Sequence, residues 1–291
     1  MPVFELQNNL LSVKINSFGA ELSSVISKDT TIEYIWQADK TIWARHAPNL
    51  FPIVGKLKNG EFTYQSKTYQ LPQHGFARDN EFICIEQTND YILFELTASE
   101  QTLINYPFHF SLQIGYKLID SKVVTSYSVF NPDNADLYFS VGAHPAFNCP
   151  LQKDEAFGDY ELVFNDKSGL IINALNDGLI TSQTKQIELK NHKLPVSKQL
   201  FENDALVFMN SQINEVKLVS SKSKHGVSLF SKDWPYYGIW SKKGTEKFVC
   251  LEPWMGIADS DTSNGNIIEK AGIIELKSEQ YYKCSFDLLF F

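Results

Sequence analysis

FHFSLQIGYKLIDSKVVTSYSVF, residues 108–130, contains two runs in which apolar and polar side chains alternate. A period of two is typical of a strand with one buried face. The segment IDSK (119–122) separates the runs with polar turn residues, and VVTSYSVF (123–130) then continues the alternation. Two such runs around a short turn predict an antiparallel β-hairpin. The apolar positions of the first run are Phe108, Phe110, Leu112, Ile114, Tyr116 and Leu118.

The same arrangement recurs on both sides of this hairpin. Strand-like runs flank short turns in 61–71, 82–98 and 215–231, and 272–291 contains two final strands around a Lys-Ser-Glu turn. The best helical pattern is VSKQLFEND (196–204), about two turns long, with Ser197 as its N-cap. With no repeat or linker in view, we predict an all-β fold. It is one large antiparallel β-sandwich over residues 1–291, with few short helices.

Composition excludes several classes of protein. Hydrophobic residues make up 43% of the 291 residues, and the formal net charge of −8 argues against a nucleic-acid or membrane-surface partner. The first ten residues lack a signal-peptide pattern, and no apolar run is long enough to cross a membrane. The cysteines form no CxxC pair, so we expect free thiols and a cytoplasmic location; they are Cys84, Cys149, Cys250 and Cys284.

LPQHGFARDN (71–80) places a histidine, a glycine and an arginine directly after a predicted strand. Gly75 lets the chain bend beside His74 or lets a ligand approach the backbone closely. Arg78 carries a planar fork of donors that suits a carboxylate, a phosphate or vicinal hydroxyls. The stretch predicts either a ligand-binding loop or a polar turn in which His74 caps a backbone carbonyl.

Two further stretches carry groups capable of proton transfer. In VGAHPAFNCP (141–150), His144 lies among apolar neighbours, as a catalytic imidazole or a satisfied core histidine would. In FVCLEPWMGIADS (248–260), Glu252 follows a buried apolar run, where desolvation favours a raised pKa unless the carboxylate is paired. Trp254 offers a stacking face two residues further on.

WARHAPNLFPIVGKLKNG (43–60) is rich in cations for an acidic chain. Arg45 and Lys56 are candidates for contact with a ligand, whereas His46 and Lys58 are typical of a solvated basic face. The sequence lacks HExxH, GxxxxGK[ST] and GxSxG, so it offers no support for a metal site, a phosphate loop or a serine nucleophile.

HGFAR, GAHPAF and LEPW, in this order and at these spacings, resemble the motifs of the aldose 1-epimerase (mutarotase) family. The similarity spans nearly the whole chain and is nearest to the branch of LacX-type and hexose-6-phosphate mutarotase-like proteins. The resemblance implies a galactose mutarotase-like β-supersandwich that needs no cofactor or metal. It also implies an isomerase that interconverts the α and β anomers of a sugar.

The resemblance assigns roles residue by residue. Glu252 matches the catalytic base and His144 the general acid, while His74 matches a second histidine that holds the sugar. Lys56 stands where galactose-type members have a substrate-contacting arginine, which is a departure from the pattern. Asp204 falls roughly where the family has a hydroxyl-binding aspartate.

Two other classes and the choice of sugar stay open. A glycoside hydrolase would need two carboxylates, and Asp204 is the one candidate partner for Glu252. A silent sugar-binding or regulatory module on the same fold is the other alternative. Arg45, Lys56 and Arg78 form a pocket for a sugar phosphate if they are not paired with acids such as Asp79.

Overall fold

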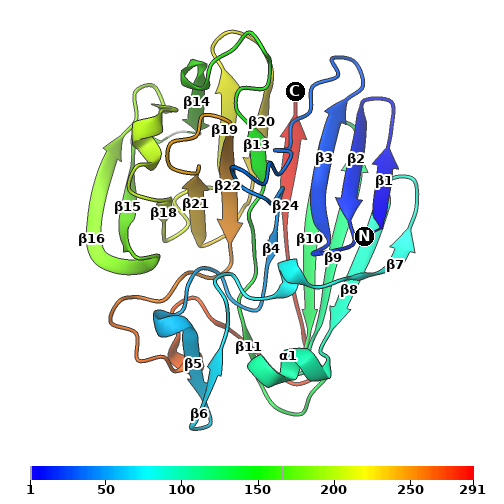
Figure 1. Ribbon diagram of the computed structural model, residues 1–291, viewed down its shortest axis with the longest axis vertical. Helices are drawn as coiled ribbons and strands as arrows, with labels where there is room; N and C mark the ends of the chain where they lie inside the picture. The colour runs from blue at the N-terminus through cyan, green and yellow to red at the C-terminus, as the bar shows by residue number, and fades with distance from the viewer. Residues whose placement is uncertain (1, 166) are drawn as a thin grey trace.

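The computed structural model describes residues 2–165 and 167–291, and strands dominate it (Figure 1). All strands within the sheets pair antiparallel. One sheet has nine strands, in the spatial order β17 (Lys193–Pro195), β14 (Tyr160–Phe164), β19 (Glu215–Ser220), β20 (Gly226–Phe230), β24 (Tyr281–Phe290), β10 (Lys122–Phe130), β9 (Ser111–Ile119), β8 (Tyr91–Thr97) and β7 (Ile83–Gln87).

A second sheet has eight strands and carries most of the residues of interest for function. Its order is β16 (Leu179–Glu188), β15 (Gly169–Asn176), β18 (Leu206–Phe208), β21 (Tyr236–Trp240), β22 (Phe248–Trp254), β12 (Gly142–Ala143) and β4 (Asn49–Leu50), with β13 (Ala146–Asn148) also paired to β22. The smaller sheets are β1 (Val3–Gln7) with β2 (Leu11–Asn16) and β3 (Glu21–Ser27), β5 (Glu61–Tyr64) with β6 (Lys67–Gln70), and β11 (Leu137–Phe139) with β23 (Ile274–Leu276).

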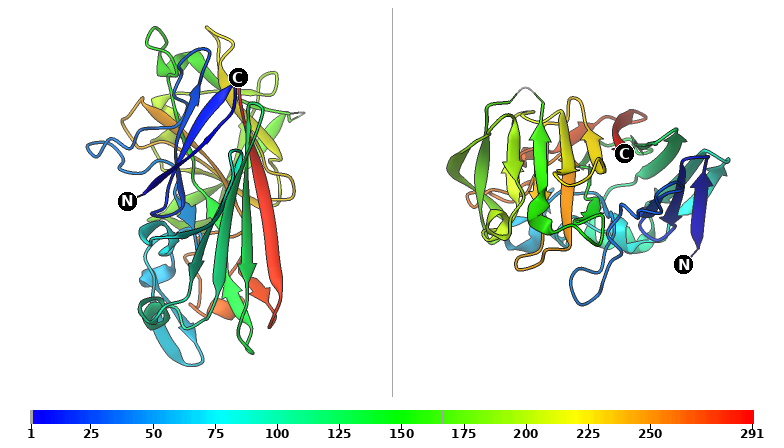
Figure 2. Two further views of the ribbon diagram at one scale, coloured as in Figure 1. Left: turned by 90° about the vertical axis from the view of Figure 1, so that its right-hand side faces the viewer. Right: turned by 90° about the horizontal axis from the view of Figure 1, so that it is seen from above.

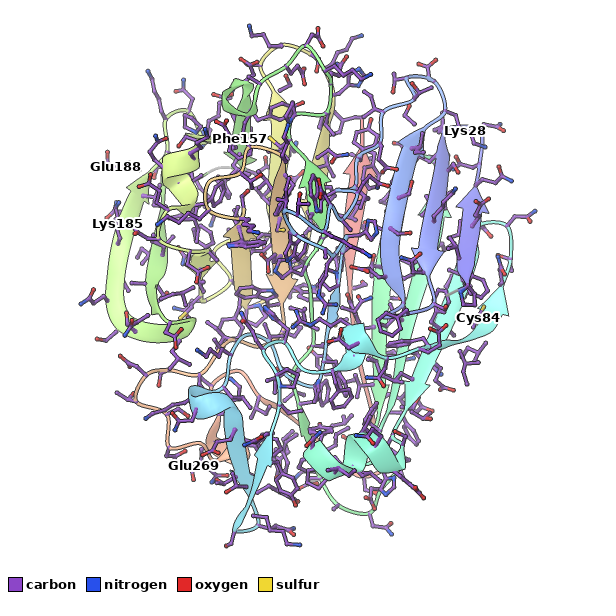
Figure 3. The ribbon with its side chains drawn as sticks, in the orientation of Figure 1. Lys28, Cys84, Phe157, Lys185, Glu188 and Glu269 are labelled. Carbon is purple, nitrogen blue, oxygen red and sulfur yellow. The ribbon has the colours of Figure 1, made fainter. Side chains whose placement is uncertain are left out.

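These sheets form packed layers. In the side view of Figure 2, the blue strands β1–β3 stand apart from the long green and red strands of the nine-stranded sheet. Aromatic contacts fill the space between layers: the rings of Phe4 and Phe94, from β1 and β8, are 5.2 Å apart. Figure 3 shows side chains throughout the interior, while the charged Lys28, Lys185 and Glu188 point outward. The predicted antiparallel sandwich is therefore confirmed.

One buried side chain connects three of the sheets. Asn49 of β4 donates through Nδ2 to the backbone carbonyls of Gly19 and Ala20, next to β3, at 2.9 Å each. Its Oδ1 accepts a hydrogen bond of 2.6 Å from the hydroxyl of Tyr127 on β10. Tyr116 of β9 joins the same network by donating to the Ala20 carbonyl at 2.7 Å. The layers are thus connected by polar contacts as well as apolar ones.

The hairpin predicted over 108–130 is confirmed. β9 and β10 pair from Ile119 opposite Lys122 outward, and alternate residues of β10 are buried. Asp120 adopts a φ of 50° in the connecting turn. The first strand begins at Ser111, and the buried Phe108 precedes it.

One local prediction, the helix over 196–204, is wrong. Residues 196–204 form only a single 3₁₀ turn, and the Ser197 side chain accepts no capping hydrogen bond there. Phe201 is the one buried residue of this turn, too small an apolar face to stabilise two helical turns. The last two strands are present as predicted, and they lie in different sheets: β23 joins β11, whereas β24 lies between β20 and β10. The 3₁₀ helices are η1 (Lys58–Gly60), η2 (Ala77–Asp79), η3 (Phe157–Asp159), η4 (Lys198–Phe201) and η5 (Ile267–Glu269).

Helices are few and short, as predicted. The one α-helix of the described residues is α1 (Glu100–Asn105), which begins with a capping box at Ser99. No helix in 2–165 or 167–291 is long and apolar enough to cross a membrane. The four cysteines are free, which confirms that prediction. That residues 1–291 form a single domain stays a prediction.

Candidate active site

A pocket of ≈ 340 Å³ opens against the eight-stranded sheet. Its walls come from β22, from the hairpin of β15 and β16, from the segment before β18, and from the loops around residues 43, 74 and 257. Six of the eight predicted site residues line it: His74, Arg78, His144, Asp204, Glu252 and Trp254. Of these six residues, the farthest apart in the chain are His74 and Trp254, 180 positions apart, and the fold brings them together.

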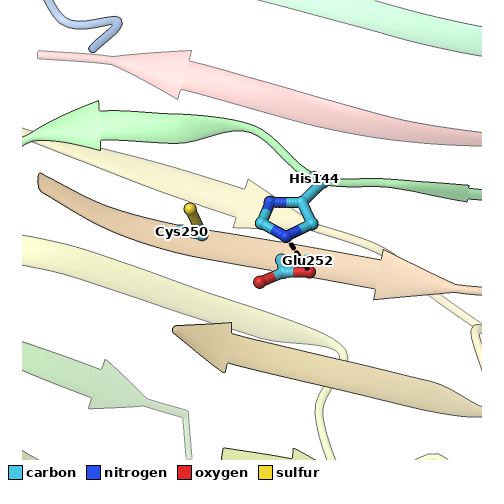
Figure 4. Close-up of side chains that lie close together, drawn as sticks. All are labelled: His144, Cys250 and Glu252. Atoms are coloured by element: carbon cyan, nitrogen blue, oxygen red, sulfur yellow. Dashed lines mark ion pairs between the residues drawn. The ribbon is translucent and has the colours of Figure 1, made fainter. Parts of the chain in front are cut away.

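Glu252 and His144 face one another across two paired segments. Glu252 lies in β22, a strand whose seven residues are all buried, so the carboxylate is only 1% exposed. His144 connects β12 and β13, both of which pair with β22, and this pairing holds the imidazole over the carboxylate. The distance from His144 Nε2 to Glu252 Oε2 is 3.1 Å (Figure 4). The pair is an acid and a base in direct contact at the pocket wall.

Burial changes the proton affinity of both partners. It raises the pKa of Glu252 well above 4.5, and the negative charge of Asp204 raises it further, while the indole N–H of Trp254 opposes the shift. Burial also lowers the pKa of His144 below 6.5, and the charges of Arg78 and Arg45 contribute in the same direction. Both shifts disfavour the ionised form, so burial favours a neutral carboxyl group and a neutral imidazole.

His74 lies in a tight turn against the loop after β4. Its φ is 67°, its backbone N–H donates to the Gly55 carbonyl at 2.8 Å, and its Nδ1 accepts from the Gly55 N–H at 3.1 Å. The imidazole therefore binds an amide N–H, not the carbonyl that the polar-turn interpretation supposed. Burial, followed by the nearby His144 and Arg78, lowers the pKa of His74 well below 6.5. With Nδ1 an acceptor, the neutral imidazole carries its proton on Nε2, which lies 3.3 Å from the side-chain amide of Gln73 at the pocket.

Of the two roles expected of Gly75, the structure supports the bend beside His74 and not the room for a ligand. A Cβ atom at Gly75 would lie 2.3 Å from the carbonyl oxygen of Phe51, and its φ is 69°. The close approach is therefore between two backbone segments, which position His74 beside the pocket.

The three candidate cations are paired with acids. Arg45 Nη2 lies 2.9 Å from Asp79 Oδ1, and Arg78 Nε lies 3.7 Å from the other oxygen of the same carboxylate. Lys56 Nζ lies 2.6 Å from Asp177 Oδ2. Arg78 lines the pocket and donates to the Gln73 carbonyl at 2.6 Å, whereas Arg45 and Lys56 lie outside the lining. The structure does not bring the three cations together into one phosphate site.

Comparison with known proteins gives consistent matches over the whole fold. The family model described as "Aldose 1-epimerase" matches residues 2–267. The chromosomal protein LacX of Lactococcus lactis subsp. lactis is 34% identical over 274 residues, which cover 91% of each chain. The chain belongs to the aldose 1-epimerase family.

Solved structures similar to this aldose 1-epimerase family member share its architecture. A galactose mutarotase related enzyme from Lactobacillus acidophilus superposes with a TM-score of 0.96 at 36% identity, over 100% of this chain and 97% of that one. A galactose mutarotase-like protein from Lactobacillus casei gives a TM-score of 0.93 at 29% identity, over 100% of both chains. The predicted galactose mutarotase-like supersandwich is thereby confirmed, and the family is one of isomerases.

Sequence reasoning missed two tryptophans of this aldose 1-epimerase pocket. The ring of Trp43 stacks on His144 at a centroid distance of 5.1 Å and 29°, and the ring of Trp240 meets His144 edge-on at 5.7 Å. Trp240 lies on β21, opposite Cys250 of β22, the strand that carries Glu252. Its position in the pocket therefore follows from the pairing of β21 with β22, which the sequence does not show. Trp43 lies two residues before Arg45, in a stretch whose many cationic residues were the stronger indication of a ligand-binding site.

His144, Cys250 and Glu252 are the metal-capable residues that gather in the described part of this epimerase. One ligand atom of each lies within 4.8 Å of the others, and such a set is chemically able to bind zinc. Figure 4 shows Cys250 on the same strand as Glu252, two residues before it. Burial raises the pKa of the Cys250 thiol well above 9.0, which disfavours the thiolate that a metal requires. Independence from metal stays a prediction.

Proposed function

We propose that this protein is an aldose 1-epimerase that interconverts the α and β anomers of a hexose or hexose 6-phosphate. The contact of 3.1 Å between His144 Nε2 and Glu252 Oε2 at the pocket wall carries the proposal. Ring opening requires a base at the C1 hydroxyl and an acid at the ring oxygen. Both oxygens are bonded to the same carbon, so the acid and the base must lie close to each other.

Glu252 and His144 supply the two proton transfers. Glu252 removes the proton of the C1 hydroxyl while His144 gives a proton to the ring oxygen, and the hemiacetal C–O bond breaks to leave an open aldehyde. Rotation about C1–C2 exposes the other face, and the two transfers run in reverse as the ring closes. The reaction therefore needs one proton on the pair, and the pair regains it in every cycle.

The reaction starts with the shared proton on His144 and a carboxylate at Glu252. Burial by itself favours two neutral partners, with the proton on Glu252. Transfer across the 3.1 Å contact produces the carboxylate base and the imidazolium acid. Sugar hydroxyls and polar groups from the pocket wall stabilise these charges on binding.

The remaining pocket residues hold the sugar. We assign Nε2–H of His74 and the guanidinium of Arg78 to sugar oxygens, and the carboxylate of Asp204 to sugar hydroxyls. Trp254, at 6% exposure, supplies an apolar face for the ring. Arg45, paired with Asp79, supports the loop of Arg78 from outside the pocket. The proposal includes a small sugar as the ligand and a cytoplasmic location. It includes no nucleic-acid or membrane partner.

The hydrolase alternative receives less support from the geometry. A glycoside hydrolase uses two carboxyl groups separated by about 5 Å or about 6.5–9.5 Å. Here the partner in contact with Glu252, at 3.1 Å, is an imidazole. The arrangement suits proton exchange between neighbouring oxygens better than attack by a distant water.

Replacing the base tests the proposal. Glu252→Gln keeps the shape of the side chain but removes its proton-accepting oxygen. We expect a loss of about 10²–10⁴-fold in kcat. The optical rotation of freshly dissolved α-glucose and α-galactose, followed with and without protein, measures the rate.

Glu95→Gln is the matched control, since Glu95 lies on β8 and binds Ser111 and Gln113 away from the pocket. Equal rates for parent and Glu252→Gln would contradict the assigned base. A parent without effect on free or 6-phosphorylated hexoses would favour the silent module. Parent protein dialysed against EDTA should keep its rate if no metal takes part.

A further inference from the structure

The indole of Trp254 lies between two glycines of the neighbouring strands. Trp254, the last residue of β22, lies opposite Gly142 of β12. Gly238 of β21 lies opposite Glu252. A Cβ atom at Gly238 would lie 2.5 Å from Cζ2 and Cη2 of the indole, and one at Gly142 would lie 2.9 Å from its Cδ1. The ring therefore occupies space that only glycine leaves open on both sides.

This arrangement places the indole N–H beside the candidate base. Side chains two positions apart on a strand point to the same face, and both Trp254 and Glu252 line the pocket. Nε1 is bonded to Cδ1 and Cε2, which lie against Gly142 and Gly238. These glycines belong to the strands on either side of β22. The N–H edge of the ring thus lies over the strand that carries Glu252.

The indole N–H is buried and unsatisfied. Trp254 is 6% exposed, and its Nε1 has no hydrogen-bond partner among the residues that the structure describes. A buried indole N–H ordinarily has an acceptor, because an unpaired buried donor is costly. Burial raises the pKa of Glu252, and this N–H acts in the opposite direction. The donor is therefore placed to respond to charge at Glu252.

Four titratable groups of the described chain also act on Glu252 or respond to its charge. His144 contacts Oε2 of the carboxyl group at 3.1 Å, and the negative charge of Asp204 raises the pKa of Glu252. Burial raises the pKa values of Tyr237 and Cys250, so both stay neutral. Tyr237 packs in the main apolar core, outside the pocket lining. A carboxylate has about four acceptor sites, so a donor is accommodated in addition to His144.

We propose that Trp254 is a positioning residue whose indole N–H donates a hydrogen bond to the carboxylate form of Glu252. The proposal rests on the proposed function. A hydrogen bond to a charged acceptor is stronger than one to a neutral carboxyl group, so the N–H stabilises the ionised base selectively. It thereby favours the state in which the shared proton is on His144, from which ring opening starts.

Nuclear magnetic resonance of the free protein tests the hydrogen bond independently of activity. The indole ¹H–¹⁵N signal of Trp254, assigned by its loss in Trp254→Phe, should move downfield as Glu252 loses its proton with rising pH. The ¹³C signal of the Glu252 carboxyl group, assigned by its loss in Glu252→Gln, gives the pKa. In Glu252→Gln the indole signal should stay in place. An indole signal of the parent that does not follow the titration of Glu252 would overturn the proposal.

Trp254→Phe separates the hydrogen bond from packing, because it keeps an aromatic ring and removes the donor. Loss of the donor should raise the pKa of Glu252 further and lower kcat about tenfold, the effect of one charge-assisted hydrogen bond. Loss of packing alone would admit water and lower this pKa instead. A lowered pKa, or a raised KM with an unchanged kcat, would show that Trp254 only excludes water or stacks on the sugar, and the proposal would fail.

Gly238→Ala displaces the ring without removing the donor. The added methyl group would lie 2.5 Å from two indole carbons that phenylalanine lacks. The variant should therefore lower kcat in the parent but have little further effect in Trp254→Phe. Equal effects of Gly238→Ala in both backgrounds would contradict the proposal.

Trp234→Phe is the matched control. It removes a buried indole whose N–H donates to the Ser285 carbonyl at 2.9 Å, outside the pocket lining. Its kcat and the pKa of Glu252 should equal those of the parent. If the parent accelerated no sugar, the proposed function would fail, while the two resonance titrations would still decide whether the hydrogen bond forms.

Discussion

The proton shared by His144 and Glu252 is the feature of single residues on which the proposed chemistry depends. Burial moves the two pKa values in opposite directions, so the pair carries one proton over a wide pH range. A solvated histidine would instead change charge near 6.5. The stacked ring of Trp43 excludes water from one face of His144 and so helps to maintain this state.

We expect kcat/KM to be level between the pKa of His144, lowered to about 3, and the raised pKa of Glu252. Protonation of the pair a second time requires a pH below the lowered pKa of His144, and loss of its proton requires a pH above the raised pKa of Glu252. Activity should therefore fall on the alkaline side. Polarimetry over this range, corrected for the spontaneous reaction at each pH, measures the profile. An acid limb centred near 6.5 would contradict the shifted pKa of His144.

The sequence motifs identified the ionisable residues of the site. Each of these residues has few other possible roles among the neighbours that its motif gives it. His74, His144 and Glu252 come from three separate motifs and line one pocket. Asp79, the partner of Arg45 and Arg78, was among the acids that the sequence suggested, whereas the partner of Lys56 was not predictable. Asp177, which binds Lys56, lies 121 positions away in the turn between β15 and β16.

At the scale of elements, one aspartate joins the segments that form the floor of the pocket. The Asp259 N–H donates to the Lys56 carbonyl at 2.9 Å, and its carbonyl accepts from the Ile180 N–H at 2.8 Å. Its side chain accepts from the Lys58 N–H at 3.0 Å and lies 3.2 Å from Lys270 Nζ. The loop after β4, the start of β16 and the loop after β22 are therefore held by a buried ion pair.

Lys270→Met should destabilise the protein and weaken substrate binding together. It leaves the Asp259 carboxylate buried without its cation, which costs about 3–5 kcal/mol. Since Ile257 and Ala258 line the pocket next to Asp259, we expect KM to rise more than kcat falls. Urea unfolding and saturation kinetics measure the two effects.

The double variant Asp259→Asn/Lys270→Met should recover part of the stability, because it removes both charges. Lys14→Met breaks an exposed pair with Glu5 on β1 and β2 and should change neither quantity. A destabilised Lys270→Met with an unchanged KM would show that the ion pair supports the fold without positioning the pocket.

The existence of strands was predictable, but their partners were not. Alternation identifies a strand from its own residues, whereas pairing depends on contacts far away in the chain. β23 and β24 follow each other in sequence yet join different sheets. The helix predicted over 196–204 was wrong, because a short polar–apolar pattern fits several local structures. The chain forms a 3₁₀ turn at 198–201 instead.

At the scale of the whole molecule, successive parts of the chain belong to different sheets. Buried contacts between the sheets determine how the sheets pack against one another. Sequence alone predicted one large sandwich. It did not predict that Asn49, in the two-residue strand β4, joins the three-stranded sheet to the nine-stranded one. An asparagine next to an apolar run has no local signal for this role. Its partners, Ala20, Tyr116 and Tyr127, are far away in sequence.

Tyr127→Phe should destabilise the sandwich without affecting the chemistry. It leaves Oδ1 of Asn49 buried without its donor, at a cost of about 1–3 kcal/mol. Asn49→Ala should cost more, because it also leaves the Gly19 carbonyl without this donor. Denaturant unfolding at constant m-value measures the change.

Tyr281→Phe, on a side chain 60% exposed, is the control and should match the parent. Because Asn49 and Tyr127 lie outside the pocket lining, kcat/KM for glucose at 25 °C should stay at the parental value. A Tyr127→Phe variant as stable as the parent would mean that apolar packing alone holds the layers together.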